Sequence, residues 1–182
     1  MKIVGIDQSI RSTGICVFED GKLVYATRAV SEAKTDHIDR LLSISKVVVD
    51  ICKDADYVFF EDLPFAMKSP SIRILAALLM HMLIELRDKK CTLLNPSTVK
   101  KFATGHGAAD KSMMLNSIHP DEFAKLREFN GGVLRNIHDM GDAYHIGRLG
   151  QKIVEAGIFR PFKNLGSKLY DMKDLEYITN LS

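Results

Sequence analysis

Residues 2–28, KIVGIDQSIRSTGICVFEDGKLVYATR, decide the fold of this chain. They contain three β-type segments: residues 2–6, which end on Asp7, and residues 14–18 and 22–28, which flank the turn Glu19-Asp20-Gly21. An Asp-Gly pair between apolar runs is a strong hairpin signal, because both residues tolerate the left-handed backbone of a tight turn. The stretch therefore predicts three antiparallel strands at the start of the domain.

Helical and strand-like segments alternate after these strands. Apolar residues three or four positions apart indicate helices, and short apolar runs indicate buried strands. The expected helices cover residues 36–53, 69–88 (with Ser69 as N-cap and Pro70 in the first turn), a short segment opened by Asn95 or Ser97, a segment capped by Asp110, and 137–156; the expected strands cover 57–60 and 91–94. This order predicts an α/β fold with a mixed sheet.

Composition sets the class of protein more broadly. The 182 residues, 46% of them hydrophobic, fit one domain (1–182), in which residues 157–182 form a C-terminal extension without an assigned role. A net charge of +2 does not by itself indicate a nucleic-acid binder. Cys16, Cys52 and Cys91 lie singly among apolar neighbours, so we expect reduced core residues. The absence of a leader-like or membrane-spanning pattern predicts a cytoplasmic protein.

Four carboxylates stand where apolar side chains are expected. On the last long helix, Asp139 and Asp142 share one face with Ala143, Ile146, Leu149 and Ile153, and this face must pack on the sheet. Asp7 and Glu61 each end a buried strand. Buried like charges are costly unless a cation neutralises them, so the pattern predicts a metal site.

Oxygen ligands without a Cys or His cluster favour Mg²⁺, with Mn²⁺ able to substitute, over zinc. Two such ions could activate a water and stabilise the leaving 3′ oxygen of a phosphodiester. Each carboxylate also has a simpler interpretation. Asp7 could be a turn residue, Glu61 a solvated strand end, and Asp139 a group that favours the positive end of its helix.

In four ordered blocks the sequence resembles the RuvC-type Holliday-junction resolvases, which have an RNase H-like fold with a five-stranded mixed sheet and helices on both faces. The blocks span about residues 3–150. They are Gly5-Ile6-Asp7 with Ser12-Thr13-Gly14; Val58-Phe59-Phe60-Glu61; Asn95-Pro96-Ser97-Thr98-Val99-Lys100 with Thr104-Gly105-His106-Gly107-Ala108-Ala109-Asp110-Lys111; and Asp139-Met140-Gly141-Asp142-Ala143. The turn Gln8-Ser9-Ile10-Arg11 lacks the usual glycine, which suggests a divergent, phage-type branch.

The resemblance implies a homodimer that nicks two opposing strands of a four-way DNA junction and leaves 5′-phosphate and 3′-hydroxyl ends. It implies that Asp7, Glu61, Asp139 and Asp142 bind metal and catalyse, that Lys111 lies near the scissile phosphate, and that Phe65 contacts bases at the junction centre. Phe65 could equally be a loop aromatic that covers the core. His106 has no settled role. His138 could act as a ligand or proton carrier beside Asp139, but helix geometry points it about 100° away from its neighbour, which favours a role without chemistry.

Basic side chains lie in loops or helix starts near the acidic blocks, where they could contact phosphates and add a salt-dependent, sequence-independent affinity. These candidates are Arg11, Lys68, Arg73, Lys100, Lys101 and Lys111. A solvated rim is an equally simple interpretation for Lys68 and Arg73.

Three other functions remain open. The N-terminal hairpin also resembles that of actin-like and sugar-kinase ATPases, although 182 residues cannot hold the two domains of that fold. A non-catalytic junction-binding protein is a second alternative, but it would have no electrostatic reason to keep four carboxylates. The third is a nuclease with the same chemistry that acts on flaps, forks or RNA-DNA hybrids. The helix at 72–88 could be either a dimer surface or a core helix.

Overall fold

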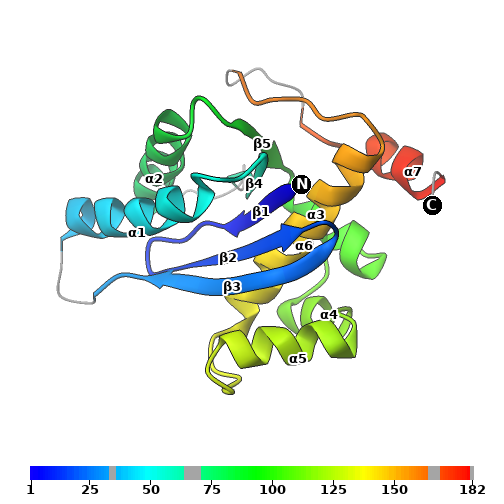
Figure 1. Ribbon diagram of the computed structural model, residues 1–182, viewed down its shortest axis with the longest axis horizontal. Helices are drawn as coiled ribbons and strands as arrows, with labels where there is room; N and C mark the ends of the chain where they lie inside the picture. Colours follow the sequence, from blue (N-terminus) through cyan, green and yellow to red (C-terminus); the bar gives the residue numbers. More distant parts are fainter. Residues whose placement is uncertain (33–35, 64–70, 164–168, 181–182) are drawn as a thin grey trace.

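A mixed five-stranded sheet forms the centre of the molecule (Figure 1). The computed structural model describes residues 1–32, 36–63, 71–163 and 169–180. The strands are β1 (Lys2–Asp7), β2 (Ser12–Glu19), β3 (Lys22–Val30), β4 (Tyr57–Glu61) and β5 (Lys90–Leu94), in the order β3-β2-β1-β4-β5. The first three strands pair antiparallel, whereas β4 runs parallel to both β1 and β5. The predicted sheet is confirmed.

The β2–β3 hairpin turns at the predicted Asp-Gly pair. Asp20 and Gly21 have φ angles of 47° and 83°, the left-handed values that a tight turn between twisted strands requires. The pairing of β2 with β3 shifts its register between Val17 and Phe18, just before this turn. Strand β1 pairs with β2 on one side and with β4 on the other, so the strand that carries Asp7 is central in the sheet.

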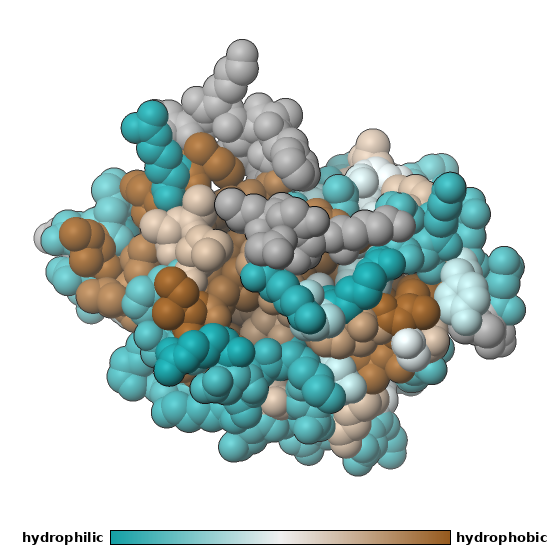
Figure 2. All heavy atoms as spheres, turned by 90° about the horizontal axis from the view of Figure 1, so that it is seen from above, coloured by the Kyte–Doolittle hydropathy of each residue, from teal (hydrophilic) through white to brown (hydrophobic). Residues whose placement is uncertain are grey.

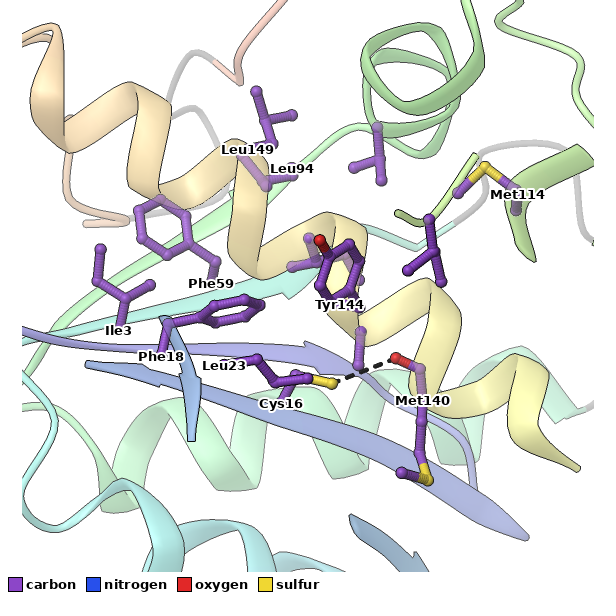
Figure 3. Close-up of a cluster of buried hydrophobic side chains, with 14 of the residues drawn as sticks. Ile3, Cys16, Phe18, Leu23, Phe59, Leu94, Met114, Met140, Tyr144 and Leu149 are labelled. Atoms are coloured by element: carbon purple, nitrogen blue, oxygen red, sulfur yellow. Dashed lines mark hydrogen bonds between the residues drawn. The ribbon is translucent and has the colours of Figure 1, made fainter. Parts of the chain in front are cut away.

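Helices cover both faces of the sheet, as predicted. On one face α1 (His37–Cys52) and α2 (Ser71–Glu85) pack against alternate side chains of β1, β2 and β4. The other face is covered by α3 (Pro96–Thr104), α4 (Lys111–Asn116), α5 (Pro120–Phe129), α6 (Ile137–Glu155) and α7 (Met172–Asn180). In this second layer Phe18 and Phe59 of the sheet meet Tyr144 and Leu149 of α6 (Figure 3). The two hydrophobic clusters hold the sheet between them.

Two predicted helix caps, Asn95 (rather than Ser97) and Asp110, are confirmed, and Asp36 is a further cap that the sequence analysis did not assign. Asp36, Asn95 and Asp110 each accept hydrogen bonds from backbone N–H groups in the first turn of α1, α3 and α4. The expected Ser69-Pro70 start of α2 lies outside the described residues, and α2 ends at Glu85 rather than near Asp88. The helix α6 starts at Ile137 as predicted and ends at Glu155.

The C-terminal extension packs on the same core. The side chains of Tyr170, Leu175 and Ile178 are buried in the cluster that contains α3 and α6. Arg160 makes a bidentate ion pair with Asp174, at 2.7 and 3.0 Å, and its guanidinium lies over the Tyr170 ring. The extension therefore packs against α3 and α6.

The three cysteines are buried and free, as expected. Among the described helices, none combines the length and the apolar character that a membrane span requires.

Candidate active site

Asp7 and Glu61 leave the sheet side by side. Strands β1 and β4 are parallel neighbours, and Ile6 is in register with Phe60. The next residue of each strand is a carboxylate, so both acids lie at the same edge of the sheet. The two acids are therefore close enough to contribute to one site, as the predicted metal site requires.

Helix α6 crosses the sheet at this edge because two glycines allow close contact. A Cβ atom on Gly5 would lie 2.4 Å from the carbonyl oxygen of Ala143, and one on Gly14 would lie 1.9 Å from that of Asp139. Both distances are far shorter than any real contact of a Cβ atom, so only glycine lets the helix backbone approach here. The first two turns of α6, which carry Asp139 and Asp142, are thereby brought to the end of β1.

A cavity of about 510 Å³ opens where these elements meet. Its carboxylates are Asp7, Glu61, Asp142 and Asp110, the last of which caps α4, and its basic residues are Lys100 of α3 and Lys111 of α4. The remaining lining residues are Pro96, Val99, Ala109 and Met114. The carboxylates would attract cations. The two lysines would attract an anion, which could lie between them and the acids.

The carboxylates repel one another in a poorly solvated place. Burial, and then neighbouring carboxylates with Glu61 first, raise the pKa of Asp7 well above its usual value. Burial and the charge of Asp142 raise the pKa of Glu61 to about 7. Burial also raises the pKa of Asp142, while Lys111 acts in the opposite direction. Lys100 and Lys111 offset only part of these shifts, and a bound cation would supply further positive charge.

Asp139 is engaged by partners of its own. Ser12 Oγ donates a hydrogen bond of 2.5 Å to its Oδ2, and Arg28 Nη1 donates to Ser12 Oγ at 3.4 Å. His138 Nε2 lies 3.2 Å from Asp139 Oδ1. The prediction that His138 points away from Asp139 is therefore wrong, because the imidazole reaches back to its neighbour's carboxylate.

The predicted basic residues fall into different places. Lys100 and Lys111 line the acidic cavity, whereas Lys101 lines a separate groove beside α7. Arg11 borders a small cavity between the β1–β2 loop and α2, and Arg73 is exposed on α2. Phe65 and Lys68 lie outside the described residues, so their assignments stay predictions. His106 is exposed in the loop after α3.

The donor set fits a hard divalent cation. Within the described ranges, no three His, Cys, Asp or Glu side chains already have the arrangement of a bound metal ion. The candidate ligands Asp7, Glu61 and Asp142 nevertheless line one cavity, where burial, and then the charge of Asp142, raise the pKa of Glu61 to about 7. Carboxylate oxygens are the ligands that Mg²⁺ prefers.

Two contacts at this site were not predicted. Gln8 is buried beside Asp7 and donates from Nε2 to the Glu61 carbonyl, which ties the β1–β2 loop to the end of β4. Ser12 holds Asp139. Ser12 belongs to the first motif block and Gln8 to the turn within it, but their partners are 127 and 53 residues away, so no local pattern reveals the pairing.

Comparison with known proteins identifies the class of fold. No family model matches the chain, and no protein of curated function does. Its sheet order and helix layers are those of the RuvC/RNase H-like fold. Among solved structures, Thermus thermophilus RuvC matches with a TM-score of 0.68 and 20% identity, over 89% of this chain and 100% of that one.

Two structures solved with DNA match as well. Thermus thermophilus RuvC in complex with a Holliday-junction substrate has a TM-score of 0.68 and 16% identity, over 89% of this chain and 99% of that one. The fowlpox virus resolvase in complex with substrate Holliday-junction DNA has a TM-score of 0.53 and 17% identity, over 85% and 99%. The resemblance of fold to Holliday-junction resolvases thus extends over most of the chain.

Proposed function

We propose that the chain is a magnesium-dependent endodeoxyribonuclease that resolves four-way DNA junctions. The observation that carries this proposal is the cavity in which Asp7, Glu61 and Asp142 face Lys100 and Lys111. A phosphodiester needs cations at its reacting oxygens and positive charge around its other oxygens, and this cavity offers sites for both. The fold shared with resolvases supports the choice of a branched DNA substrate.

The residues have separate roles in this proposal. Asp7, Glu61 and Asp142 hold two divalent cations, with Asp139 as a fourth ligand. When bound, the cations supply an activated water and stabilise the leaving 3′ oxygen. Lys111 holds the scissile phosphate, and Lys100 a non-bridging oxygen or an adjacent phosphate. The products carry 5′-phosphate and 3′-hydroxyl ends.

Cutting two opposing strands requires two active sites, so we propose a homodimer. Exposed apolar side chains on α1 and α2 form the surface proposed to pair: Ile38 (70% exposed), Leu42 (48%), Met80 (41%) and Ile84 (56%). Seen from above in Figure 2, hydrophobic atoms gather on the side where these two helices lie in Figure 1. Apolar side chains exposed together in this way are typical of protein interfaces.

A nuclease with the same chemistry but another substrate is the second candidate. The metal-binding carboxylates would be the same for flaps, forks or RNA-DNA hybrids, because substrate choice depends on dimer geometry and on the loops around the cavity. A substrate panel separates these functions.

The test incubates the purified protein with labelled four-way, three-way, forked, linear and hybrid substrates in Mg²⁺, Mn²⁺ or EDTA. We expect cleavage of the four-way junction in Mg²⁺ or Mn²⁺, and at least about a hundredfold loss in Asp7→Asn, because a carboxylate that holds the cations is removed. Glu128→Gln, an exposed carboxylate change on α5, is the matched control and should cleave normally. Faster cleavage of forks or hybrids than of four-way junctions would favour the second candidate.

A further inference from the structure

The imidazole of His145 is buried in the layer beneath the active site. It lies on α6, one turn after Asp142, and is only 2% exposed. Its Nε2 atom is 2.8 Å from the carbonyl oxygen of Met114 and 3.2 Å from Ser117 Oγ. A carbonyl can only accept, so Nε2 carries the proton and donates it to Met114. Burial lowers the pKa of His145, which favours the neutral ring.

The acceptor of this bond is an unsatisfied end of a helix. Met114 lies in the last turn of α4, where carbonyl groups lack partners within the helix. The following amides bond elsewhere, Ser117 N–H to Met113 and Ile118 N–H to Leu115. The Met114 carbonyl instead accepts from Ser117 Oγ, at 2.7 Å, and from His145. His145 thus caps the C-terminal end of α4 from another helix.

Helix α4 depends on such contacts because it has only six residues. A helix of this length does not persist without tertiary packing. Its Met114 side chain enters the hydrophobic cluster under α6 (Figure 3), and a Cβ atom on Gly141 would lie 2.5 Å from Leu115 Cδ2, so the two helices pack closely. The first residue of α4 is Lys111, which lines the acidic cavity. The position of Lys111 therefore follows the docking of α4 on α6.

We propose that His145 is a positioning residue that holds Lys111 at the acidic cavity by fixing the end of α4 to α6. This inference rests on the proposed function, in which Lys111 holds the scissile phosphate. The hydrogen bond connects the helix that carries Asp139 and Asp142 to the helix that carries Lys111. It sets the distance between the acids and the lysine without touching the substrate.

The first test measures hydrogen exchange of the α4 amides in the full-length protein. His145→Leu removes the donor and keeps an apolar side chain, so exchange in residues 112–117 should be about three- to tenfold faster, as expected for one lost buried hydrogen bond. His145→Gln keeps an N–H donor near the position of Nε2 and should restore slow exchange. Ser117→Ala, a milder change at the same carbonyl, should raise exchange in the same direction by a smaller factor.

The second test is a double-mutant cycle with Lys111→Ala, read as the single-turnover rate of junction cleavage. His145→Leu should slow cleavage about three- to tenfold in the wild-type background and less than about twofold in the Lys111→Ala background, because two residues that act through one position are not additive. His81→Leu is the control: His81 Nδ1 lies 2.8 Å from Ser45 Oγ and joins α1 to α2 on the other face of the sheet. It should leave α4 exchange and the cycle unchanged.

Equal slowing in both backgrounds, or unchanged exchange in α4, would overturn the inference. Failure of the proposed function has a different signature, namely that the wild-type protein cleaves no substrate in the panel. The exchange experiment would then still decide whether His145 holds α4, because it requires no activity.

Discussion

At the scale of single residues, the carboxylates of the cavity oppose folding when no cation is present. The pKa of Glu61 is about 7 in the folded protein against 4.5 for an unperturbed glutamate. Between these values the folded state binds more protons than the unfolded chain, so the free energy of unfolding falls as pH rises through this window. Asp7 and Asp142, whose pKa values are also raised, act in the same direction.

Replacing Glu61 by glutamine should stabilise the metal-free protein while abolishing cleavage. The change removes a buried negative charge, so we expect roughly 1–3 kcal/mol of added stability at pH 8 in EDTA and a Tm higher by about 2–4 °C per kcal/mol. The gain should shrink towards pH 4.5, where wild-type Glu61 is protonated. Thermal unfolding at several pH values measures both effects.

Glu128→Gln again serves as the control and should change neither Tm nor its pH dependence. Addition of Mg²⁺ should stabilise the wild type more than Glu61→Gln, because the variant lacks one ligand. A Tm for Glu61→Gln below that of the wild type at pH 8 in EDTA would contradict the electrostatic account.

The candidate carboxylates could be found from the sequence because each breaks a local pattern. Asp139 and Asp142 interrupt an apolar helix face, and Asp7 and Glu61 end apolar strands. The structure brings three of them to one cavity and gives Asp139 separate partners. The contacts of Ser12 and His145 could not be predicted, since a serine or histidine in an apolar surrounding shows no partner until distant segments are packed.

At the scale of elements, the approach of α6 to the sheet decides where the acids lie. Gly14 of β2 faces the backbone of Asp139, and Gly5 of β1 faces that of Ala143. A backbone contact cannot yield as a flexible side chain can, so any larger residue must push the helix away. The positions of Asp139 and Asp142 therefore depend on two glycines of the sheet.

Gly14→Ala should separate α6 from β2. Its Cβ atom would lie 1.9 Å from the Asp139 carbonyl oxygen, and overpacking of this kind costs about 1–3 kcal/mol. We expect a lower Tm and slower junction cleavage. Gly107→Ala is the matched control, because its nearest contact would be an ordinary 3.4 Å to the Ser97 carbonyl oxygen. A Gly14→Ala protein as stable and active as the control would show that the helix is not held this closely.

Most elements follow from local signals, and the exceptions have a common cause. The five strands and the helices α1, α3, α4 and α6 have clear apolar patterns, and the predicted Asp-Gly turn and the predicted caps of α3 and α4 are confirmed. Helix α5 was not predicted: it buries only Leu126, so its apolar stripe is weak. Helix α7 buries Leu175 and Ile178, but it lies in the extension to which the sequence analysis assigned no role, because its amphipathic pattern is short and weak. Both helices are stabilised by packing on the rest of the protein, which a local sequence pattern does not reveal.

At the scale of the whole molecule, the two helical layers have different proposed roles. The layer with α3, α4 and α6 builds the acidic cavity, while α1 and α2 on the opposite face expose the apolar surface proposed to pair. Two copies joined through α1 and α2 would keep both cavities open to DNA.

Ile84→Arg should weaken the proposed dimer. A charged side chain at a 56% exposed apolar position opposes burial against a second copy without disturbing the fold of the monomer. Light scattering coupled to gel filtration should show a shift from dimer to monomer, and paired cleavage should become single nicks. Val133→Arg, at a 53% exposed position before α6, should leave the dimer intact. A wild-type monomer at micromolar concentration would contradict the pairing.

The central claim is that the four-way junction is cut through cations held by the acidic cavity. The most direct measurement uses a four-way junction labelled on each strand in turn, incubated with the wild type or Asp7→Asn in Mg²⁺ or in EDTA, followed by ligase treatment of the products. We predict symmetric nicks in two opposing strands that ligase reseals, seen only with wild type and Mg²⁺, together with retained junction binding by Asp7→Asn. Cleavage that persists in EDTA or in Asp7→Asn would contradict the account.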